Sequence, residues 1–317
     1  MLKVPKIAII IPVYNREHLL AYTLDSIIAQ SFTDWECILV DDDSTDGSSE
    51  VLRQYQKKDS RFKAYKRPGE LKKGANSCRN YGFTKSTAPF VKWFDSDDIM
   101  LSNHLDIAYQ ILIENNLDFV VTDTVNFDYI TGDMIDKPYN FDRMNAVFSP
   151  ENYAFNEIGW ITDDFLGTRE CVQDIRFNEN ITDGDEYNFF IKFLNQSTKG
   201  SFINQVLTYR RLHEGSISIQ NQENIIKYEL IIATLKYQTA QDLVVYNDKK
   251  LIRWFLSGYM QYAYKLALKR QSVNFKKEAV KLIRNYFSFS NAVAFIIAII
   301  MAKYLGKGYV ILKYART

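Results

Sequence analysis

The stretch that decides the fold is Lys6–Asn15, KIAIIIPVYN, in which a run of mostly β-branched side chains ends in a polar turn. A short apolar run bounded by turn residues is typical of a strand that is buried on both faces of a sheet. Two later stretches repeat the pattern. WECILV at 35–40 is followed by DDDSTD at 41–46, and FVKWF at 90–94 is followed by DSDD at 95–98. These strands predict one sheet with polar clusters along one edge.

Helix-like patterns lie between the strands. Asn15 is suited to cap the first helix, which we expect to reach about Gln30. Strands that alternate with helices at short spacing favour the α/β class, with a parallel or mixed sheet covered by helices. Ligands of such sheets bind beyond the carboxyl ends of the strands, so the polar clusters predict a site. The other expected helices cover 48–57, 75–85 and 102–114, and further strands cover 62–65 and 117–122.

The acidic cluster DSDD at 95–98 needs compensation, because neighbouring like charges destabilise one another. Taken alone, it is explained by an acidic turn before a helix. Its placement beside the two other clusters favours a ligand site instead. The sequence has no GxGxxG after the first strand and no GxxxxGK[ST], so a glycine loop does not hold phosphates. Carboxylates suit Mg²⁺ or Mn²⁺, and we expect such an ion, carrying a nucleotide, to supply the positive charge.

The composition indicates one large or two modest globular domains, with 317 residues that are 47% hydrophobic and 24% charged. The cysteines Cys37, Cys78 and Cys171 lie far apart and form no CxxC pair, so they suggest neither a disulfide framework nor a zinc site. No signal-peptide pattern precedes the first strand. We expect a cytoplasmic protein with reduced thiols.

The net charge of +1 hides a strong asymmetry. Of the 39 basic and 38 acidic side chains, 14 basic ones and one acid, Glu278, lie after Asp248, which leaves 25 and 37 before it. The last part of the chain therefore carries a charge of +13, and this points to an anionic partner. The apolar run Ala292–Ala302 is only 11 residues long, whereas a membrane-spanning helix needs about 20.

We therefore expect this basic tail to bind an anionic membrane surface, with a helix lying among the headgroups of the cytoplasmic leaflet. One alternative is that the apolar run packs against the body of the protein or a partner subunit. Another is nucleic-acid binding, for which an apolar run between the charges is a poor fit, so no nucleic-acid partner is expected.

The segment IIIPVYNREHLLAYTLDSIIAQSFTDWECILVDDDSTDGS, followed by GANSCRNYG and FDSDD, resembles family 2 glycosyltransferases of the GT-A fold. The resemblance covers residues 6 to about 215. It implies a Rossmann-like mixed sheet with helices on both faces in residues 1–220, where 1–125 bind the nucleotide-sugar and 126–220 bind the acceptor. Residues 221–317 are then a basic, helical C-terminal extension.

The resemblance also implies donor-binding residues. Pro12, Tyr14 and Asp42 fall where relatives hold the nucleoside, with an aspartate accepting from the base. Arg79 and Asn80 belong to a segment like the family's ARN motif, which helps to form the donor site.

The resemblance assigns the DSDD cluster to the family's DxD motif. Asp95 and Asp97 would hold the ribose and a divalent ion, Mn²⁺ or Mg²⁺, and Asp98 is able to take either role. His213 follows a strand that closes the site in relatives. It is a further candidate for binding the metal ion or the pyrophosphate. The alternative is that His213 is an ordinary surface histidine. Arg210 or Arg211 is a candidate for the pyrophosphate alone.

An inverting transfer needs a carboxylate that takes the acceptor's proton. Relatives place an acidic pair at the start of a helix, and here Asp185 fits best, with Glu186 next. The alternative is that both acids only favour the helix N-terminus. Two departures from the family pattern stand out: Asp43 replaces a common glycine in VDDGS, which leaves the nucleobase open, and Pro89 replaces the glycine before the DxD strand.

The implied function is transfer of one sugar from a nucleotide-diphosphate donor, UDP favoured, to a hydroxyl of a glycan or lipid-linked acceptor in cell-surface polysaccharide synthesis. The chain lacks the QxxRW motif of processive relatives. The alternatives are transfer onto a polyprenyl phosphate and a catalytically silent scaffold that binds nucleotide or glycan. Candidates for acceptor contacts are Trp160, Asp163, Asp164 and Arg169, which the sequence does not rank.

Overall fold

The computed structural model describes residues 4–213 and 224–317, which form two compact units. The sheet unit holds the described residues of Met1–Glu179 and Phe189–His213. The helical unit holds Asn180–Asn188 and the described residues of Glu214–Thr317. The domain boundary expected at residue 220 lies outside the described residues, and the division at residue 125 stays a prediction.

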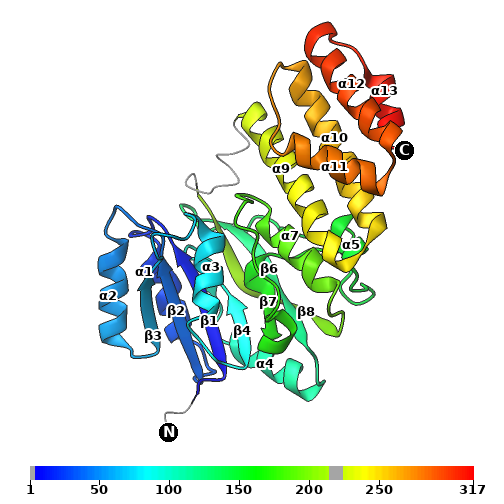
Figure 1. Ribbon diagram of the computed structural model, residues 1–317. Helices are drawn as coiled ribbons and strands as arrows, with labels where there is room; N and C mark the ends of the chain where they lie inside the picture. The colour runs from blue at the N-terminus through cyan, green and yellow to red at the C-terminus, as the bar shows by residue number, and fades with distance from the viewer. Residues whose placement is uncertain (1–3, 214–223) are drawn as a thin grey trace. The chain divides into compact units, whose positions relative to one another are not determined.

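One mixed sheet of eight strands forms the centre of the sheet unit, in the order β3-β2-β1-β4-β7-β6-β8-β5 (Figure 1). The first four strands pair in parallel, β7 is antiparallel to both β4 and β6, and β8 is parallel to β6 but antiparallel to β5. The predicted α/β fold with a mixed sheet is confirmed. The strands are β1 (Ile7–Val13), β2 (Trp35–Asp41), β3 (Phe62–Lys66), β4 (Phe90–Trp93), β5 (Ile99–Met100), β6 (Phe119–Asp128), β7 (Phe165–Thr168) and β8 (Gly200–Leu212).

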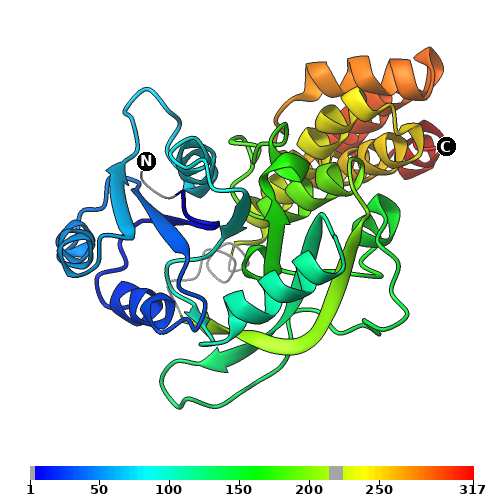
Figure 2. The ribbon, with the colours of Figure 1, turned by 90° about the horizontal axis from the view of Figure 1, so that it is seen from below.

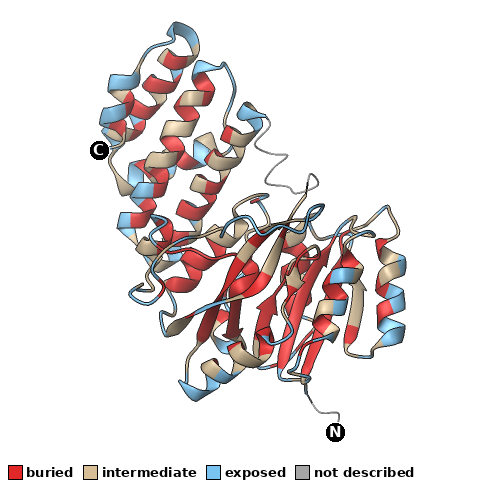
Figure 3. Ribbon diagram, turned by 180° about the vertical axis from the view of Figure 1, so that it is seen from behind, coloured by how far each residue is buried: buried red, intermediate tan, exposed pale blue. Residues whose placement is uncertain are grey.

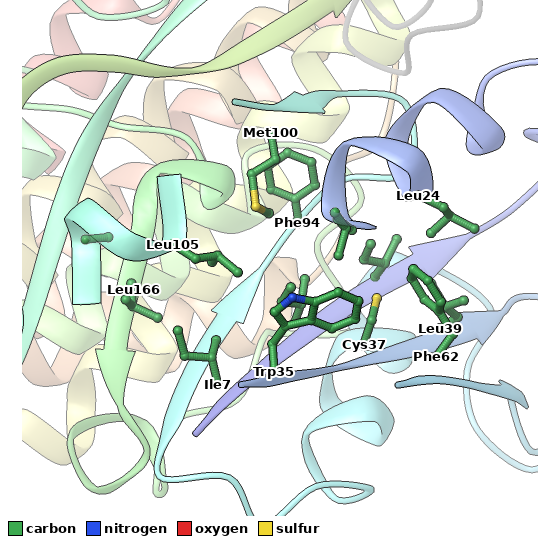
Figure 4. Packing of buried hydrophobic residues seen from close by; sticks show 14 of the residues in the cluster. Ile7, Leu24, Trp35, Cys37, Leu39, Phe62, Phe94, Met100, Leu105 and Leu166 are labelled. Carbon is green, nitrogen blue, oxygen red and sulfur yellow. The ribbon is translucent and has the colours of Figure 1, made fainter. Parts of the chain in front are cut away.

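Helices cover both faces of the parallel half of the sheet (Figure 2). Alternate side chains of β1, such as Ile9 and Ile11, pack with α1 and α4 in a buried apolar cluster, part of which Figure 4 shows. Ile10 points to the other face, where it meets α3 at Gly82. This alternation explains why β1 is apolar throughout. The helices of this half are α1 (Leu20–Ile28), α2 (Ser48–Lys58), α3 (Ala75–Phe83) and α4 (His104–Glu114).

A second core of aromatic rings, many of which meet edge to face, lies around β4 and β7. The ring centroid of Trp93 is 4.9 Å from that of Phe189 and 5.3 Å from that of Phe177. Trp160, which is fully buried, lies 4.5 Å from the ring of Tyr153. Tyr153 belongs to α5 (Pro150–Ala154) and Phe189 to α7 (Asp185–Leu194), and the short elements between these helices include the 3₁₀ turn η1 (Thr162–Asp164) and α6 (Arg169–Val172).

The prediction that Asn15 caps the first helix is wrong. Asn15 has a left-handed backbone with φ of 51°, and the residue before α1 is Leu19. Instead, the Asn15 side chain accepts a hydrogen bond from the Thr45 amide at 2.8 Å and so ties the turn after β1 to the turn after β2. The sequence did not predict β5 or β7, because such short strands carry little local pattern, and the end of β8 was expected only from the resemblance.

Five helices make up most of the helical unit, as the predicted helical extension requires. α10 packs against α9, α11, α12 and α13. Figure 3 shows their buried sides in red and their exposed sides in pale blue. Within residues 4–213 and 224–317, no helix is long and apolar enough to cross a membrane. The elements are α9 (Ile225–Asp242), the 3₁₀ turn η2 (Leu243–Tyr246), α10 (Lys249–Leu268), α11 (Lys276–Tyr286), α12 (Phe289–Leu305) and α13 (Tyr309–Ala315).

Candidate active site

The turns after β1 and β2 are joined into one rim. The Asp42 amide donates to the Val13 carbonyl at 2.8 Å, and the Asn15 amide donates to Ser44 Oγ at 3.0 Å. Because β1 and β2 are parallel neighbours, their polar carboxyl ends meet at the same edge of the sheet. The structure therefore brings together the ends of two strands that the sequence marked as a site.

The acidic turn after β2 is held by a buried arginine. Arg67 is 5% exposed, and its guanidinium binds the carboxylate of Asp42 and, at 2.9 Å, that of Asp43. Asp43 also pairs with Lys66 at 2.8 Å, and this hydrogen bond is the main reason that the pKa of Asp43 is lowered. Nearby, the ammonium of Lys73 lies 4.1 Å from the centre of the Tyr14 ring.

The carboxylates of the DSDD turn each have a partner within the protein. Asp95 Oδ1 accepts from Arg79 at 2.7 Å, and Asp98 Oδ1 accepts from the Arg211 amide at 2.8 Å. Asp97 Oδ2 lies 3.0 Å from both Arg16 Nε and His213 Nε2. Protein groups therefore supply part of the compensation that the sequence attributed to a metal ion.

Burial affects the pKa values of the two inner carboxylates differently. Burial alone would raise the pKa of Asp97, but the hydrogen bond from His213 and the charge of Arg16 lower it overall. For Asp98, burial and the charges of Asp97 and Asp95 together raise the pKa well above its usual range. The carboxyl of Asp97 therefore loses its proton more readily than the carboxyl of Asp98.

The 3₁₀ turn η1, just before β7, contributes Asp163, which the sequence placed only among possible acceptor contacts. Oxygen atoms of Asp95, Asp98 and Asp163 lie within 4.8 Å of one another. Asp163 is fully buried, its Oδ1 accepts from the Asp95 amide at 2.9 Å, and its Oδ2 has no hydrogen-bond partner among the described residues. Burial and the charges of Asp95 and Asp98 raise the pKa of Asp163 well above its usual range. Three hard oxygen ligands with one unsatisfied oxygen fit Mg²⁺ or Mn²⁺.

A buried lysine lies beneath this cluster. Lys92, in the middle of β4, is fully buried and donates to the Asp163 carbonyl and, at 2.9 Å, to His104 Nε2. Burial lowers the pKa of Lys92 to about 8, although the carboxylates of Asp163 and Asp164 oppose this. Sequence reasoning missed its role. The available signal was a lysine inside the apolar run FVKWF, since a buried charge needs partners.

Arg79 and Asn80 of the ARN-like segment have different hydrogen-bond partners. Arg79 is 5% exposed and reaches Asp95 from α3, and its role in the donor site stays a prediction. Asn80 instead exchanges hydrogen bonds of 2.9 Å with the backbone of Phe177 and donates to Glu179 at 3.1 Å. Asn80 therefore anchors residues 177–179 in the sheet unit.

Comparison with known proteins identifies the family. The sequence pattern described as Glycosyl transferase family 2 matches residues 8–167, about half of the chain. The chain belongs to glycosyltransferase family 2. A glucosyltransferase of Campylobacter jejuni that acts on GalNAc(5)-diNAcBac-PP-undecaprenol is 25% identical over 93% of both chains. GlyG of Streptococcus pneumoniae is 28% identical over 67% of this chain and 72% of its own length.

Another relative matches a smaller part of this family 2 glycosyltransferase. WfgD of Escherichia coli, a UDP-Glc:α-D-GlcNAc-diphosphoundecaprenol β-1,3-glucosyltransferase, is 30% identical over 48% of this chain, and the match spans about half (54%) of its own length.

Solved structures agree on the GT-A fold. TarS of S. aureus in complex with UDP-GlcNAc superposes with a TM-score of 0.66 at 16% identity, over 98% of this chain and 89% of its own. PcManGT of Pyrobaculum calidifontis, solved with GDP-Man and Mn²⁺, gives 0.53 at 14%, over 96% and 89%.

The two candidate bases of this glycosyltransferase occupy the first turn of α7. Asp185 and Glu186 are the acidic residues of that turn, where carboxylates are stabilised by the helix dipole. Gly184 precedes them with a left-handed φ of 75°. Both acids belong to residues 180–188, which are grouped with the helical unit, whereas the carboxylates described above belong to the sheet unit.

The residues considered for acceptor contacts have structural roles in the sheet unit. Trp160 and Asp164 are buried, and Asp164 Oδ1 accepts from Thr124 at 2.6 Å. Arg169 donates through its side chain to the Ala88 carbonyl at 2.7 Å. Of the four candidates, only Asp163 reaches the carboxylate cluster.

Proposed function

We propose that this glycosyltransferase transfers one sugar, with inversion, from a UDP-sugar to a hydroxyl of a lipid-linked glycan in cell-surface polysaccharide synthesis. The gathering of Asp95, Asp98 and Asp163 at the carboxyl edge of a family 2 sheet carries the proposal. Two relatives are named for transfer to undecaprenol-linked glycans, and TarS was solved with UDP-GlcNAc. These names support the choice of acceptor class and of donor nucleotide.

The nucleoside would bind at the joined turns after β1 and β2. Pro12 lies near the end of β1, Tyr14 is the first residue after β1, and Asp42 is the first residue after β2. Arg67 donates a hydrogen bond to Oδ1 of Asp42. The other oxygen, Oδ2, would accept a hydrogen bond from the nucleobase. In this arrangement Arg67 orients the carboxylate and keeps Asp43 beside it.

Mn²⁺ or Mg²⁺ would complete the donor site. Asp95, Asp98 and Asp163 form one set of oxygen ligands, and Asp97 with His213 forms a second pair. When bound, the ion neutralises negative charge on the diphosphate as it leaves. Arg79 orients Asp95, and the Arg211 amide orients Asp98.

Asp185, or Glu186 in its place, would act as the general base. The carboxylate takes the proton of the acceptor hydroxyl while that oxygen attacks the anomeric carbon from the face opposite the diphosphate. The bond between the anomeric carbon and the diphosphate oxygen breaks with its electron pair on the diphosphate. The sugar passes through an oxocarbenium-like state and its configuration is inverted.

Calorimetric titration with UDP, GDP and TDP, each with and without Mn²⁺, tests the donor site. We expect metal-dependent binding of UDP. No binding of any nucleotide would favour the catalytically silent scaffold. In a turnover assay, we expect Asp185→Asn to lower kcat by about 100-fold or more and to leave UDP binding unchanged, with Glu186→Gln as the matched comparison.

If Glu186→Gln loses turnover and Asp185→Asn does not, the roles of the two acids are exchanged. Turnover that survives both substitutions would contradict the mechanism. Polyprenyl phosphate, offered in parallel with a polyprenyl-diphosphate glycan, distinguishes the alternative acceptor.

A lipid-linked acceptor implies that the enzyme works at a membrane. We propose peripheral association with the cytoplasmic face, through the basic residues that follow Asp248.

A further inference from the structure

The outer side of α12 carries an apolar stripe that the other described residues leave exposed. Phe289, Val293, Ile297, Ile300 and Tyr304 are 67, 37, 42, 49 and 72% exposed (Figure 3). Their spacing of three or four residues places them along one side of the helix. We call these five residues the outer stripe.

The opposite side of the same helix belongs to the core of the helical unit. Ala292, Phe295, Ala298, Ile299 and Ala302 are buried. The apolar run at 292–302 therefore divides between two uses. Six of its 11 residues are buried within the protein, as the alternative expectation held, and Val293, Ile297 and Ile300 contribute to an exposed surface that continues to both ends of α12.

α13 extends this surface. Its residue Tyr314 donates a hydrogen bond to Ser290 Oγ at 3.1 Å, and Asn291 donates to the Tyr314 carbonyl at 3.0 Å, so the end of α13 lies against the start of α12. Val310 and Tyr314 are 81% and 55% exposed. Seven large apolar or aromatic side chains on two adjoining helices exceed the scattered exposed residues that are normal on a protein surface.

Cationic side chains accompany the apolar surface. The guanidinium of Arg284 lies 5.8 Å from the ring centre of Phe289, and the ammonium of Lys303 lies 5.8 Å from that of Tyr304. On α13, the ammonium of Lys313 lies 5.2 Å from the ring centre of Tyr309. No acidic residue follows Glu278 in the sequence.

We propose that the outer stripe and the exposed side of α13 dock on an anionic lipid surface, with α12 lying in the plane of the headgroups. Exposed aromatic and aliphatic side chains next to lysine and arginine are the composition of helices that bind at this interface. A second copy is the weaker choice of occupant, because a symmetric pairing through this face would bring like charges together. The inference rests on the proposed membrane-borne acceptor and names the surface that reaches the membrane.

Vesicle flotation of the full chain tests the proposal. The probes are vesicles of 70% phosphatidylcholine with 30% phosphatidylglycerol, compared with pure phosphatidylcholine. We expect the protein to float with the anionic vesicles and to remain largely free with the neutral ones. Raising the salt concentration is expected to weaken the binding.

The stripe variant changes Val293, Ile297 and Ile300 to Gln. We expect its partition coefficient to fall at least tenfold, because three apolar side chains no longer enter the interface. The matched control changes Ile225, Val245 and Leu268 to Gln, because these apolar residues of the helical unit are at least as exposed as Ile297, at 64, 82 and 44%. The control is expected to bind like the parent protein.

The charge variant changes Lys303, Lys307 and Lys313 to Gln. Each cation near an anionic surface contributes about fivefold to partitioning, so we expect a loss on the order of 100-fold and a weaker salt dependence. UDP titration of every variant shows whether the donor site is intact, which separates failure of docking from failure of the proposed function.

Three results would overturn the docking proposal, of which the first two concern vesicle binding. The first is a parent protein that stays free of anionic vesicles, and the second is a stripe variant that binds them as well as the control does. The third is a parent protein that forms dimers in light scattering and becomes monomeric in the stripe variant without any vesicle binding, because the surface would then join two copies of the chain.

Discussion

At the scale of single residues, Asp43 shows how a departure from a family pattern is accommodated. Its φ of 60° lies in the left-handed region, which costs ordinary residues roughly 1–2 kcal/mol and glycine very little. This explains physically why glycine is common here in the resembling VDDGS pattern. In this chain, ion pairs of 2.8 Å to Lys66 and 2.9 Å to Arg67 hold the carboxylate in place.

Comparing Asp43→Ala with Asp43→Gly isolates the backbone effect, because both variants lose the carboxylate. We expect the Gly variant to be more stable than the Ala variant by about 1 kcal/mol, because a left-handed φ is sterically strained for Ala and not for Gly. Urea unfolding followed by fluorescence measures the difference. An Ala variant as stable as the Gly variant would contradict the left-handed assignment.

Lys92 determines the protonation of its histidine partner. A lysine ammonium only donates hydrogen bonds, so His104 Nε2 must accept, and the proton of the ring lies on Nδ1, which donates to the Leu207 carbonyl at 3.0 Å. Burial and the charge of Lys92 lower the pKa of His104 well below its usual range, which agrees with a neutral ring. The pair thus links β4 to β8.

Lys92→Met removes this ammonium while keeping a side chain of similar length. We expect the free energy of unfolding to fall by about 3–5 kcal/mol, because buried acceptors and carboxylates lose their cation. The control is Lys58→Met, which breaks the exposed pair with Asp25 and is expected to cost at most about 1 kcal/mol. Urea unfolding compares the two variants. Equal losses of unfolding free energy in the two variants would contradict this role of Lys92, because its buried contacts would then contribute no more than an exposed ion pair.

At the scale of elements, α3 depends on a glycine for its contact with the sheet. A Cβ atom on Gly82 would lie 2.6 Å from Ile10 Cγ2 and 3.3 Å from Val40 Cγ2. The close approach brings Arg79, on the same helix, to Asp95. The sequence predicted this helix from its pattern, but only the packed structure shows why one of its positions must be small.

Gly82→Ala is expected to destabilise the protein by about 1–3 kcal/mol through overpacking. Gly258→Ala, inside α10, meets only the flexible Lys236 side chain at 3.3 Å, and we expect a gain of up to about 1 kcal/mol from helix propensity. The opposite signs make the pair diagnostic in thermal unfolding. A neutral Gly82→Ala would mean that α3 moves away from the sheet easily.

At the scale of the whole molecule, local patterns predicted the four parallel strands and β6, and they missed β5 and β7. β1, β2, β3 and β4 appear in the sequence as apolar runs bounded by turn residues. β7 and β5 have only 4 and 2 residues. Their place in the sheet depends on pairing with β4, β6 and β8, which no local pattern records.

The sequence by itself determined the α/β class, the polar ends of three strands, the family and the basic tail, because these follow from residue type and short spacing. Only the tertiary structure decided which charges meet. Asp163 reaches Asp95 across 68 residues of chain, and Lys92 finds His104 inside the fold. The structure also decided which side of α12 stays exposed. Such pairings depend on long-range packing, in which burial gives each charge and each apolar side chain its partner.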